Sequence, residues 1–281
     1  MKALIDGDIL RYSCGFSAER SIYILKYYKK DGKGKSLSFS YRREMDKFIK
    51  DNNISSHVFT RGIEIGPVEH ALSNCRSLIN KILKETNSKT YQIYLTGKGN
   101  YRDKVATIRK YKGNRDKSHK PIHYDELTKY MMEIHGAVLV EGKEADDQMG
   151  IDQYKDGVGK SIQELETCIC SIDKDMNMIP GWHYNWMKNS LYLVNTDDAI
   201  LWFYCQMIMG DKVDNIVGIP GKGLVAAYKI LKDTTTEEEM YLAVRGAYED
   251  SGNLNQLEEN ALLLWIQREE NKRWIAPKVE S

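Results

Sequence analysis

The sequence predicts an α/β fold, with a mainly parallel β-sheet flanked by helices, and three observations lead to it. Short apolar runs recur at residues 3–5, at 137–140 and through 169–172, and stretches with helical spacing of apolar residues separate them. Acidic residues follow each run directly. Because ligands of parallel sheets bind beyond the carboxyl ends of the strands, we expect these acids to meet at one edge of the sheet.

Composition excludes several classes of protein. The 281 residues are 42% hydrophobic and 29% charged, which is typical of soluble globular chains, and the net charge of +1 gives no sign of a polyanionic partner. The five cysteines contain no Cys-x-x-Cys pair, which fits a reducing compartment. No run approaches the ~18 apolar residues of a membrane span. We therefore expect a cytoplasmic protein with no membrane partner.

The elements can be placed along the chain from periodicity and turn residues. Residues 3–5 form a buried strand that ends at Asp6. Residues 22–28 and 35–41 flank a glycine-containing turn and predict a peripheral β-hairpin. A helix is expected over 67–84 and a strand over 91–95. Beyond residue 196 the pattern is helical, which predicts an α/β domain over 1–195 and a helical region over 196–281.

Carboxylates gather in four short clusters, and these are the candidate metal ligands. Acids at helix starts are ordinary caps, so one cluster alone indicates little. Recurrence after apolar strands favours a shared site for a hard divalent cation such as Mg²⁺, which prefers oxygen ligands and shares its other positions with phosphate oxygens. The clusters are Asp6 with Asp8; Glu144, Asp146 and Asp147; Asp173 with Asp175; and Asp211 with Asp214.

Residues 98–120 are strongly basic, with nine Lys and Arg against two Asp, a net charge of +7. Tyr101 and Tyr111 lie among these cations, so phosphates and base faces would both find partners there. Arg102 and Arg109 have helix-like spacing with Lys112. The alternative is a solvated basic helix.

A glycine-rich segment, Gly218-Ile-Pro-Gly-Lys-Gly223, interrupts the helical region. Its glycines permit close backbone approach, and amides at the start of the following helix could hold a phosphate beside Lys222. Glycine-rich turns are also common plain connectors between helices, and this one lacks the spacing of a nucleotide triphosphate loop.

Five ordered motifs resemble those of a known family, the metal-dependent 5′-nucleases and flap endonucleases with a PIN-like fold, and most of all the tailed-phage 5′-to-3′ exonucleases. The match runs nearly end to end. The motifs are Asp6-Gly-Asp8; Tyr111-Lys-Gly-Asn-Arg115; Glu144-Ala-Asp-Asp147; Ser171-Ile-Asp-Lys-Asp175; and the segment from Gly210 to Gly223.

The resemblance implies a role for each matching residue. Lys112 and Arg115 match the basic residues that contact the scissile phosphate, with Tyr111 beside them. Residues 98–120 match the arch or gateway. Residues 210–231 match the helix-three-turn-helix that grips duplex DNA, through residues such as Gly221, Lys222 and Gly223, and that in relatives often holds K⁺. The acids that match the family's sites for two Mg²⁺ or Mn²⁺ ions are Asp6, Glu144, Asp146, Asp147, Asp173, Asp175, Asp211 and Asp214.

The activity that the resemblance implies is a 5′-to-3′ exonuclease on double-stranded DNA with a free 5′ end, with 5′-flap endonuclease activity and RNase H activity on RNA–DNA hybrids. A role in phage-type DNA replication and repair follows, with a replication polymerase or a single-strand-binding protein as partner.

One departure separates this chain from the family pattern. The family has an aspartate after the strand that precedes the arch, where this chain has Thr96 and Gly97, and Asp8 is the extra acid that could compensate. Two alternatives stay open. One is a catalytically impaired protein that binds DNA structures. The other is a phosphatase with Asp6 as covalent nucleophile, which would need neither the basic segment nor the glycine-rich turn.

Overall fold

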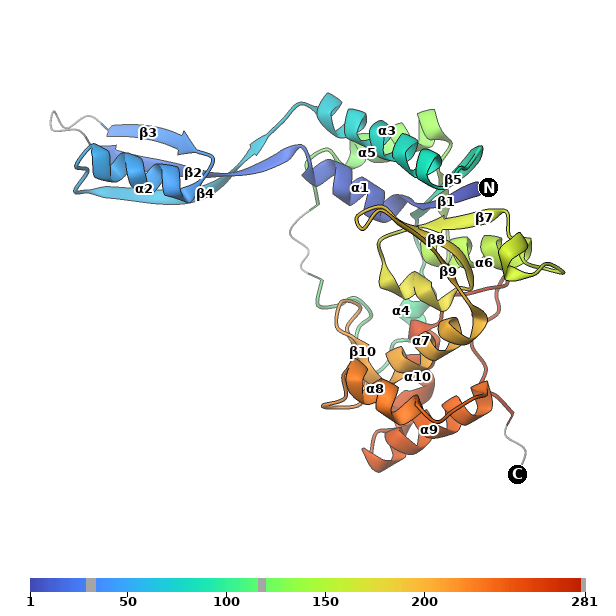
Figure 1. Ribbon diagram of the computed structural model, residues 1–281. Helices are drawn as coiled ribbons and strands as arrows, with labels where there is room; N and C mark the ends of the chain where they lie inside the picture. The colour runs from blue at the N-terminus through green and yellow to red at the C-terminus, as the bar shows by residue number, and fades with distance from the viewer. Residues whose placement is uncertain (29–33, 116–119, 279–281) are drawn as a thin grey trace. The chain divides into compact units, whose positions relative to one another are not determined.

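The structure, a computed structural model that describes residues 1–28, 34–115 and 120–278, contains a six-stranded sheet (Figure 1). The strand order is β6-β5-β1-β7-β8-β9. All neighbours pair in parallel except β8 and β9, so the mainly parallel sheet is confirmed. The strands are β1 (Lys2–Asp6), β5 (Thr90–Thr96), β6 (Val138–Val140), β7 (Thr167–Cys170), β8 (Gly181–Asn185) and β9 (Ser190–Val194).

The chain divides into two compact units. One contains residues 1–10, 79–119 and 131–281, and the other contains residues 11–78 and 120–130. The first unit holds the six-stranded sheet and the C-terminal helices. The expected boundary between residues 195 and 196 lies between β9 and the next helix, and it stays a prediction.

The central strands are buried on both faces, and for this reason their sequences are continuous apolar runs without polar alternation. Ala3, Leu4 and Ile5 of β1 have no exposed surface. Helix α6 (Ala145–Asp156) packs against β1, β5, β6 and β7. This helix begins where the chain leaves β6, so its first residues lie at the carboxyl edge of the sheet.

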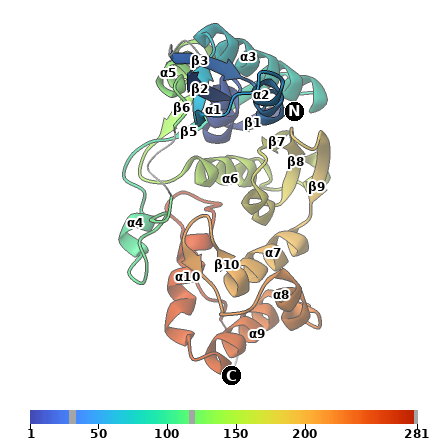
Figure 2. The same cartoon turned by 90° about the vertical axis from the view of Figure 1, so that its left-hand side faces the viewer.

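The C-terminal part of the first unit is helical, and helices α8, α9 and α10 pack against helix α7 (Figure 2). Phe203, Tyr204 and Ile208 of α7 are fully buried in the same core that contains Leu4 and Ile169 of the sheet. The helical region expected beyond residue 196 is therefore present, with two short strands between its first helices. These elements are α7 (Thr196–Met209), β10 (Gly210–Asp211), β11 (Ile216–Val217), α8 (Leu224–Leu231), α9 (Glu237–Asp250) and α10 (Leu257–Leu264).

The turn between α7 and α8 depends on two glycines. A Cβ atom on Gly210 would lie 2.2 Å from the backbone nitrogen of Gly218, and Gly210 has a φ of +69°. No other residue fits this close approach of two backbones without a shift.

The expected hairpin is present in the second unit as β2 (Glu19–Tyr28) and β3 (Gly34–Phe39). The structure adds a third antiparallel strand, β4 (His57–Ile65), beside β2, and a helix, α2 (Arg42–Asp51). Leu25, Tyr27 and Met45 form a small separate core between the sheet and α2. The strand turn itself lies at residues 29–33, outside the described residues.

The remaining helices are short or link these parts, and no helix of the described residues is long and apolar enough to cross a membrane. Helix α1 starts directly after β1, so Asp6-Gly-Asp8 is a strand-to-helix junction. These helices are α1 (Gly7–Phe16), α3 (Val68–Glu85), α4 (Arg102–Val105) and α5 (Tyr124–His135), with 3-10 turns at Ile162–Glu164, Lys174–Met178 and Leu254–Gln256.

Candidate active site

A cavity of about 170 Å³ lies at the carboxyl edge of the sheet and collects acids from all four clusters. Lys112 and Arg115 also line it. The expectation that acids from several strand ends meet at one place is therefore met. The eight carboxylates of this acidic cavity are those of Asp6, Asp8, Glu144, Asp146, Asp173, Asp175, Asp211 and Asp214.

Asp6 ends β1 at the floor of the site and is 2% exposed. Its carboxylate accepts hydrogen bonds from the backbone N–H of Ile9, at 3.0 Å, and from the hydroxyl of Ser171, at 2.7 Å. The first bond caps the start of α1, and the second ties β1 to the end of β7. Two neighbouring parallel strands thus fix the position of this acid.

The acids that follow β7 are held by the local turn. Asp173 caps the 3-10 helix and accepts a bond from the N–H of Asp175, at 2.9 Å. The amide of Gln206, on buried helix α7, donates to the carboxylate of Asp175, at 2.5 Å. Asp211, on β10, accepts from the N–H groups of Val213 and Asp214. Helix α7 and its following turn therefore bring the last cluster to the first three.

Glu144 is the most heavily hydrogen-bonded acid in the cavity. It caps α6 and accepts bonds from Asn100, at 3.0 Å, from the Tyr111 hydroxyl, at 3.1 Å, and from the Lys112 ammonium. The same Tyr111 hydroxyl is 2.8 Å from a carboxylate oxygen of Asp214, and Lys112 Nζ is 3.7 Å from Asp214. Lys112 therefore contacts two acids that come from different clusters of the sequence.

Asp147 does not line the acidic cavity, contrary to its expected role as a metal ligand. It has no exposed surface, and its two oxygens accept bonds from Arg102 at 2.6 and 3.0 Å and from the N–H groups of Glu144 and Gln267, both at 3.0 Å. Its carboxylate is fully used inside the protein.

Arg102 is likewise internal, which corrects its expected contact with DNA. It is 2% exposed, and besides Asp147 it donates to the carbonyls of Leu263 and Trp265. Its neighbours also depart from the expected helix, because α4 ends at Val105 and the chain continues in turns. Lys117 lies outside the described residues.

Asp8, the acid expected to compensate for the missing family aspartate, lines the acidic cavity. Its carboxylate accepts bonds from the N–H of Thr96, at 3.1 and 3.3 Å, and the Thr96 hydroxyl accepts one from the N–H of Ala145. The acid that the family pattern puts after this strand is absent, and a carboxylate from the first turn of α1 reaches the same strand end. In the sequence, the second acid of Asp6-Gly-Asp8 is the feature that indicates this compensation.

Burial and mutual repulsion dominate the electrostatics of the acidic cavity. Burial, followed by the charges of Asp8 and Asp173, raises the pKa of Asp6 to about 7. Burial, then Asp173 and Asp211, raises the pKa of Asp175 to about 8. Asp146 has its pKa raised by burial and by the same crowding of carboxylates.

Glu144 behaves in the opposite way. Its burial disfavours the charged form, but the cations of Lys112 and Arg102 outweigh burial and hold the pKa of the Glu144 carboxyl below its ordinary value. The acidic cavity thus contains one carboxylate that is already compensated by protein cations and several that are not.

The donor set fits hard divalent cations. Within the described residues, no group of three or more His, Cys, Asp or Glu side chains is arranged to hold an ion as it stands. The chemistry of the donors nevertheless matches Mg²⁺ or Mn²⁺, because all are carboxylate oxygens and the buried, uncompensated ones gain stability from added positive charge. Asp6, Asp146, Asp173 and Asp175 are the residues that would hold such ions.

A second, larger cavity of about 760 Å³ lies beside β10 and β11. Arg109 from the basic segment lines it together with Lys174, Lys222 and the glycine-rich turn. Gly221 has a φ of +74°, which glycine adopts without strain. Lys212 also lines this cavity, so four cations border it, and it brings Arg109 and Lys222 together although they are 113 positions apart in the sequence. Arg115, half exposed, contacts Asp214 at 2.6 Å, and both residues line the acidic cavity.

Sequence comparison finds distant relatives among phage nucleases, and no family model matches. An exodeoxyribonuclease of enterobacteria phage T3 is 31% identical over 119 residues, which cover 40% of this chain and 37% of that protein. An exonuclease of Escherichia phage T7 is 30% identical over 119 residues, covering 40% of this chain and 38% of that protein. The matched segment thus spans less than half of either relative.

Structure comparison covers nearly the whole chain. The bacteriophage T5 D15 protein, crystallised with metal ions, has a TM-score of 0.58 at 18% identity and covers 93% of this chain and 88% of its own. The T5 5′-exonuclease with bound zinc ions has a TM-score of 0.58 at 18% identity, and the match covers 94% of this chain and 88% of that one. The T5 D15 flap endonuclease with DNA and metal ions has a TM-score of 0.55 at 19% identity, and the match covers 69% of this chain and 80% of that one. The fold of the chain and its distant sequence relatives thereby confirm its resemblance to the phage 5′-exonuclease and flap endonuclease family.

Proposed function

We propose that the protein is a divalent-metal-dependent 5′-nuclease that hydrolyses phosphodiester bonds of DNA. The observation that carries this proposal is the acidic cavity, where eight carboxylates from four separate chain segments meet beside Lys112 and Arg115. Capping accounts for some of these acids one by one, but not for their convergence with Lys112, Arg115 and Lys174 at one edge of the sheet.

The residues of the cavity have separable tasks. Two Mg²⁺ or Mn²⁺ ions, when bound, supply an activated water and neutralise the phosphate during in-line displacement. Lys112 binds a non-bridging oxygen of the scissile phosphate and stabilises charge that develops there. Tyr111 and Glu144 orient the Lys112 side chain, through the hydrogen bonds described above.

Release of Lys112 from Glu144 accompanies substrate binding in this proposal. In the free protein the ammonium compensates Glu144, with Asp214 3.7 Å away. The ammonium lines the acidic cavity, so the scissile phosphate would replace Glu144 as its partner. Arg115, with half of its side chain exposed, assists at the rim.

Substrate selection follows from the larger cavity. Lys222, Arg109 and the backbone of the glycine-rich turn would contact phosphates of the duplex away from the cut, which fixes the position of the DNA without reading its sequence. We therefore propose little sequence preference, action at free 5′ ends and at 5′ flaps, and K⁺ held by backbone carbonyls of this turn. Hydrolysis of RNA in hybrids, and a replication polymerase or single-strand-binding protein as partner, belong to the same proposal.

The experiment is cleavage of end-labelled duplexes with a 5′ overhang, a 5′ flap or an RNA strand, each with Mg²⁺, with Mn²⁺ and with a chelator. Asp146→Asn should abolish cleavage and retain DNA binding, because it removes one oxygen donor and leaves the fold unchanged. Asp250→Asn, which removes a charge from the exposed end of α9, is the matched control. Binding without metal-dependent cleavage by the unaltered protein would show instead a DNA-structure-binding protein.

A further inference from the structure

The three-stranded sheet and its helix, residues 19–65, form a separate basic module that the proposed active site does not use. We call it the β-extension. It contains eleven Lys and Arg against six Asp and Glu, a net charge of +5. Because the whole chain carries only +1, the other residues together carry −4. A polyanion is thus attracted to the β-extension more strongly than to the average surface of the protein.

Helix α2 covers only part of one face of this sheet. Met45 of α2 packs on Leu25 and Tyr27, which alternate along β2, and α2 contacts β2 and β3. Phe59 and Arg61 of β4 lie on the same face as these β2 residues, because Phe59 pairs with Leu25 and Arg61 with Tyr23. Both remain exposed beside the helix.

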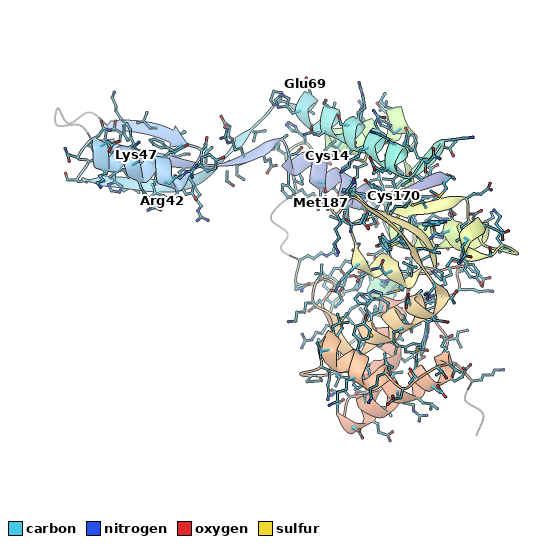
Figure 3. All side chains as sticks on the ribbon, viewed as in Figure 1. Cys14, Arg42, Lys47, Glu69, Cys170 and Met187 are labelled. Atoms are coloured by element: carbon cyan, nitrogen blue, oxygen red, sulfur yellow. The ribbon has the colours of Figure 1, made fainter. Side chains whose placement is uncertain are left out.

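Three arginines of the β-extension lie over aromatic rings: Arg42 and Arg43 at the start of α2, and Arg61 on β4. The guanidinium carbon of Arg42 is 4.0 Å from the ring centre of Phe59, that of Arg43 is 5.2 Å from Tyr41, and that of Arg61 is 5.8 Å from Tyr23. Arg42 is marked on α2 in Figure 3. We call this set the arginine–aromatic surface; it consists of Tyr23, Tyr41, Arg42, Arg43, Phe59 and Arg61.

Most of the donors on this surface are not used inside the protein. Arg42 bonds Asp46 through Nε, at 2.8 Å. Among the described residues, neither Arg43 nor Arg61 has an ion pair with a carboxylate. A guanidinium held over a ring keeps its edge N–H groups directed outward, where a phosphate can accept two of them. Tyr41 is 54% exposed and Phe59 36%, so their rings are accessible as well.

From this arrangement we propose that the arginine–aromatic surface binds single-stranded DNA, separately from the site of cleavage. Proteins that bind single strands combine cations that follow the backbone with rings on which bases stack, and this surface has both. Duplex DNA would engage only the cations, because its bases are already stacked. The choice of DNA as the partner rests on the proposed function.

The test is binding of a fluorescent oligothymidylate to the full-length protein in chelator, where no cleavage occurs, across a salt series. Arg43→Ala/Arg61→Ala should weaken binding and reduce the salt slope by about 1.4, since each phosphate contact on a single strand contributes about 0.7. Phe59→Leu should weaken binding at least about fivefold with an unchanged salt slope, because it removes a stacking platform and no charge.

The matched control is Arg20→Ala/Lys26→Ala. Both residues lie on the face of β2 opposite to that of Tyr23 and Leu25, because side chains alternate along a strand. The control variant therefore removes two positive charges from the same module, as Arg43→Ala/Arg61→Ala does. We expect it to change oligothymidylate binding much less than Arg43→Ala/Arg61→Ala does. Circular dichroism of each variant checks that the β-extension remains folded.

Three outcomes overturn the proposal: equal losses in the two double variants, no loss in Phe59→Leu, or an equal loss of affinity for duplex DNA and for the single strand. Cleavage has no part in these measurements. A protein that binds oligothymidylate through this surface yet hydrolyses no DNA would contradict the proposed function and leave this inference standing.

Discussion

Arg102 and Asp147 form a buried bidentate ion pair, in which Nη1 and Nη2 of Arg102 lie 2.6 and 3.0 Å from the two carboxylate oxygens of Asp147. The pair joins the basic segment to the start of α6. Through Leu263, Trp265 and Gln267, it also joins both to the chain after α10. The basic segment, the start of α6 and residues 263–267 are thus joined to one another by a single pair of charges.

The first prediction separates Asp147 from its neighbour. Asp147→Ala should lower the free energy of unfolding by about 3–5 kcal/mol, because it leaves the Arg102 charge buried and unpaired. Asp146→Ala should leave that free energy unchanged or higher, since it removes a carboxylate whose pKa is raised by crowding. Urea unfolding without added metal measures both. Equal destabilisation by the two substitutions would refute the structural role assigned to Asp147.

The second prediction concerns Lys112. If its ammonium stabilises charge on the scissile phosphate, Lys112→Ala should lower the single-turnover rate of cleavage by roughly 10²-fold or more and affect DNA affinity much less. Lys110→Ala removes an exposed cation two residues away and serves as the control. A rate that returns to that of the unaltered protein at saturating concentration would assign Lys112 to docking of the substrate.

The third prediction is a dependence of stability on pH in the absence of metal. The pKa values of Asp6 and Asp175 rise on folding from 3.8 to about 7 and about 8, so the folded protein retains protons that the unfolded chain releases. Unfolding free energy should therefore fall as the pH rises from about 4 to about 8. Chemical unfolding at both ends of this window measures the effect.

Added Mg²⁺ should counter that fall at the upper end, because a bound cation stabilises the ionised carboxylates. Asp6→Asn/Asp175→Asn should reduce the metal-free dependence, since it removes two of the carboxyl groups whose pKa values are raised and leaves Asp146 and Asp173. If stability were constant or rose over this window, and Mg²⁺ had no effect, the acids would not be the crowded, uncompensated set that the structure describes.

The strands and acid clusters were predictable from the sequence because the pattern that reveals them is local. Asp146 and Asp147 could not be told apart in this way. They are consecutive on α6, about 100° apart around the helix, and only the position of Arg102, distant in sequence, decides which one faces the cavity. Arg102 itself was misassigned because a cation within a basic run gives no sign of being buried.

The β-extension shows a different limit. Strand β4 is exposed along almost its whole length, so it lacks the alternation of apolar and polar residues that marks a half-buried strand. Its position is fixed by pairing with β2, a contact between residues about 40 apart along the chain. Asp8 is a similar case, since its role depends on a hydrogen bond to Thr96 from another strand.

The last prediction tests the glycine-rich turn. Lys222 is exposed and lines the larger cavity with Arg109, and no ion pair of Lys222 exists among the described residues. If it contacts one phosphate, Lys222→Ala should weaken duplex binding similarly for all sequences and reduce the salt slope by about one. Cleavage chemistry at saturating protein should survive, because Lys222 does not line the acidic cavity.

The measurement is binding of a duplex with a 5′ overhang across a salt series in Ca²⁺, chosen to keep the acids occupied without cleavage. Lys155→Ala, in the last turn of α6, removes one exposed charge elsewhere in the same unit and should leave the slope unchanged. An unchanged slope and affinity in Lys222→Ala would make Gly218–Gly223 an ordinary connector between helices. The duplex would then have to be held through the other cations that line the larger cavity, which are Arg109, Lys174 and Lys212.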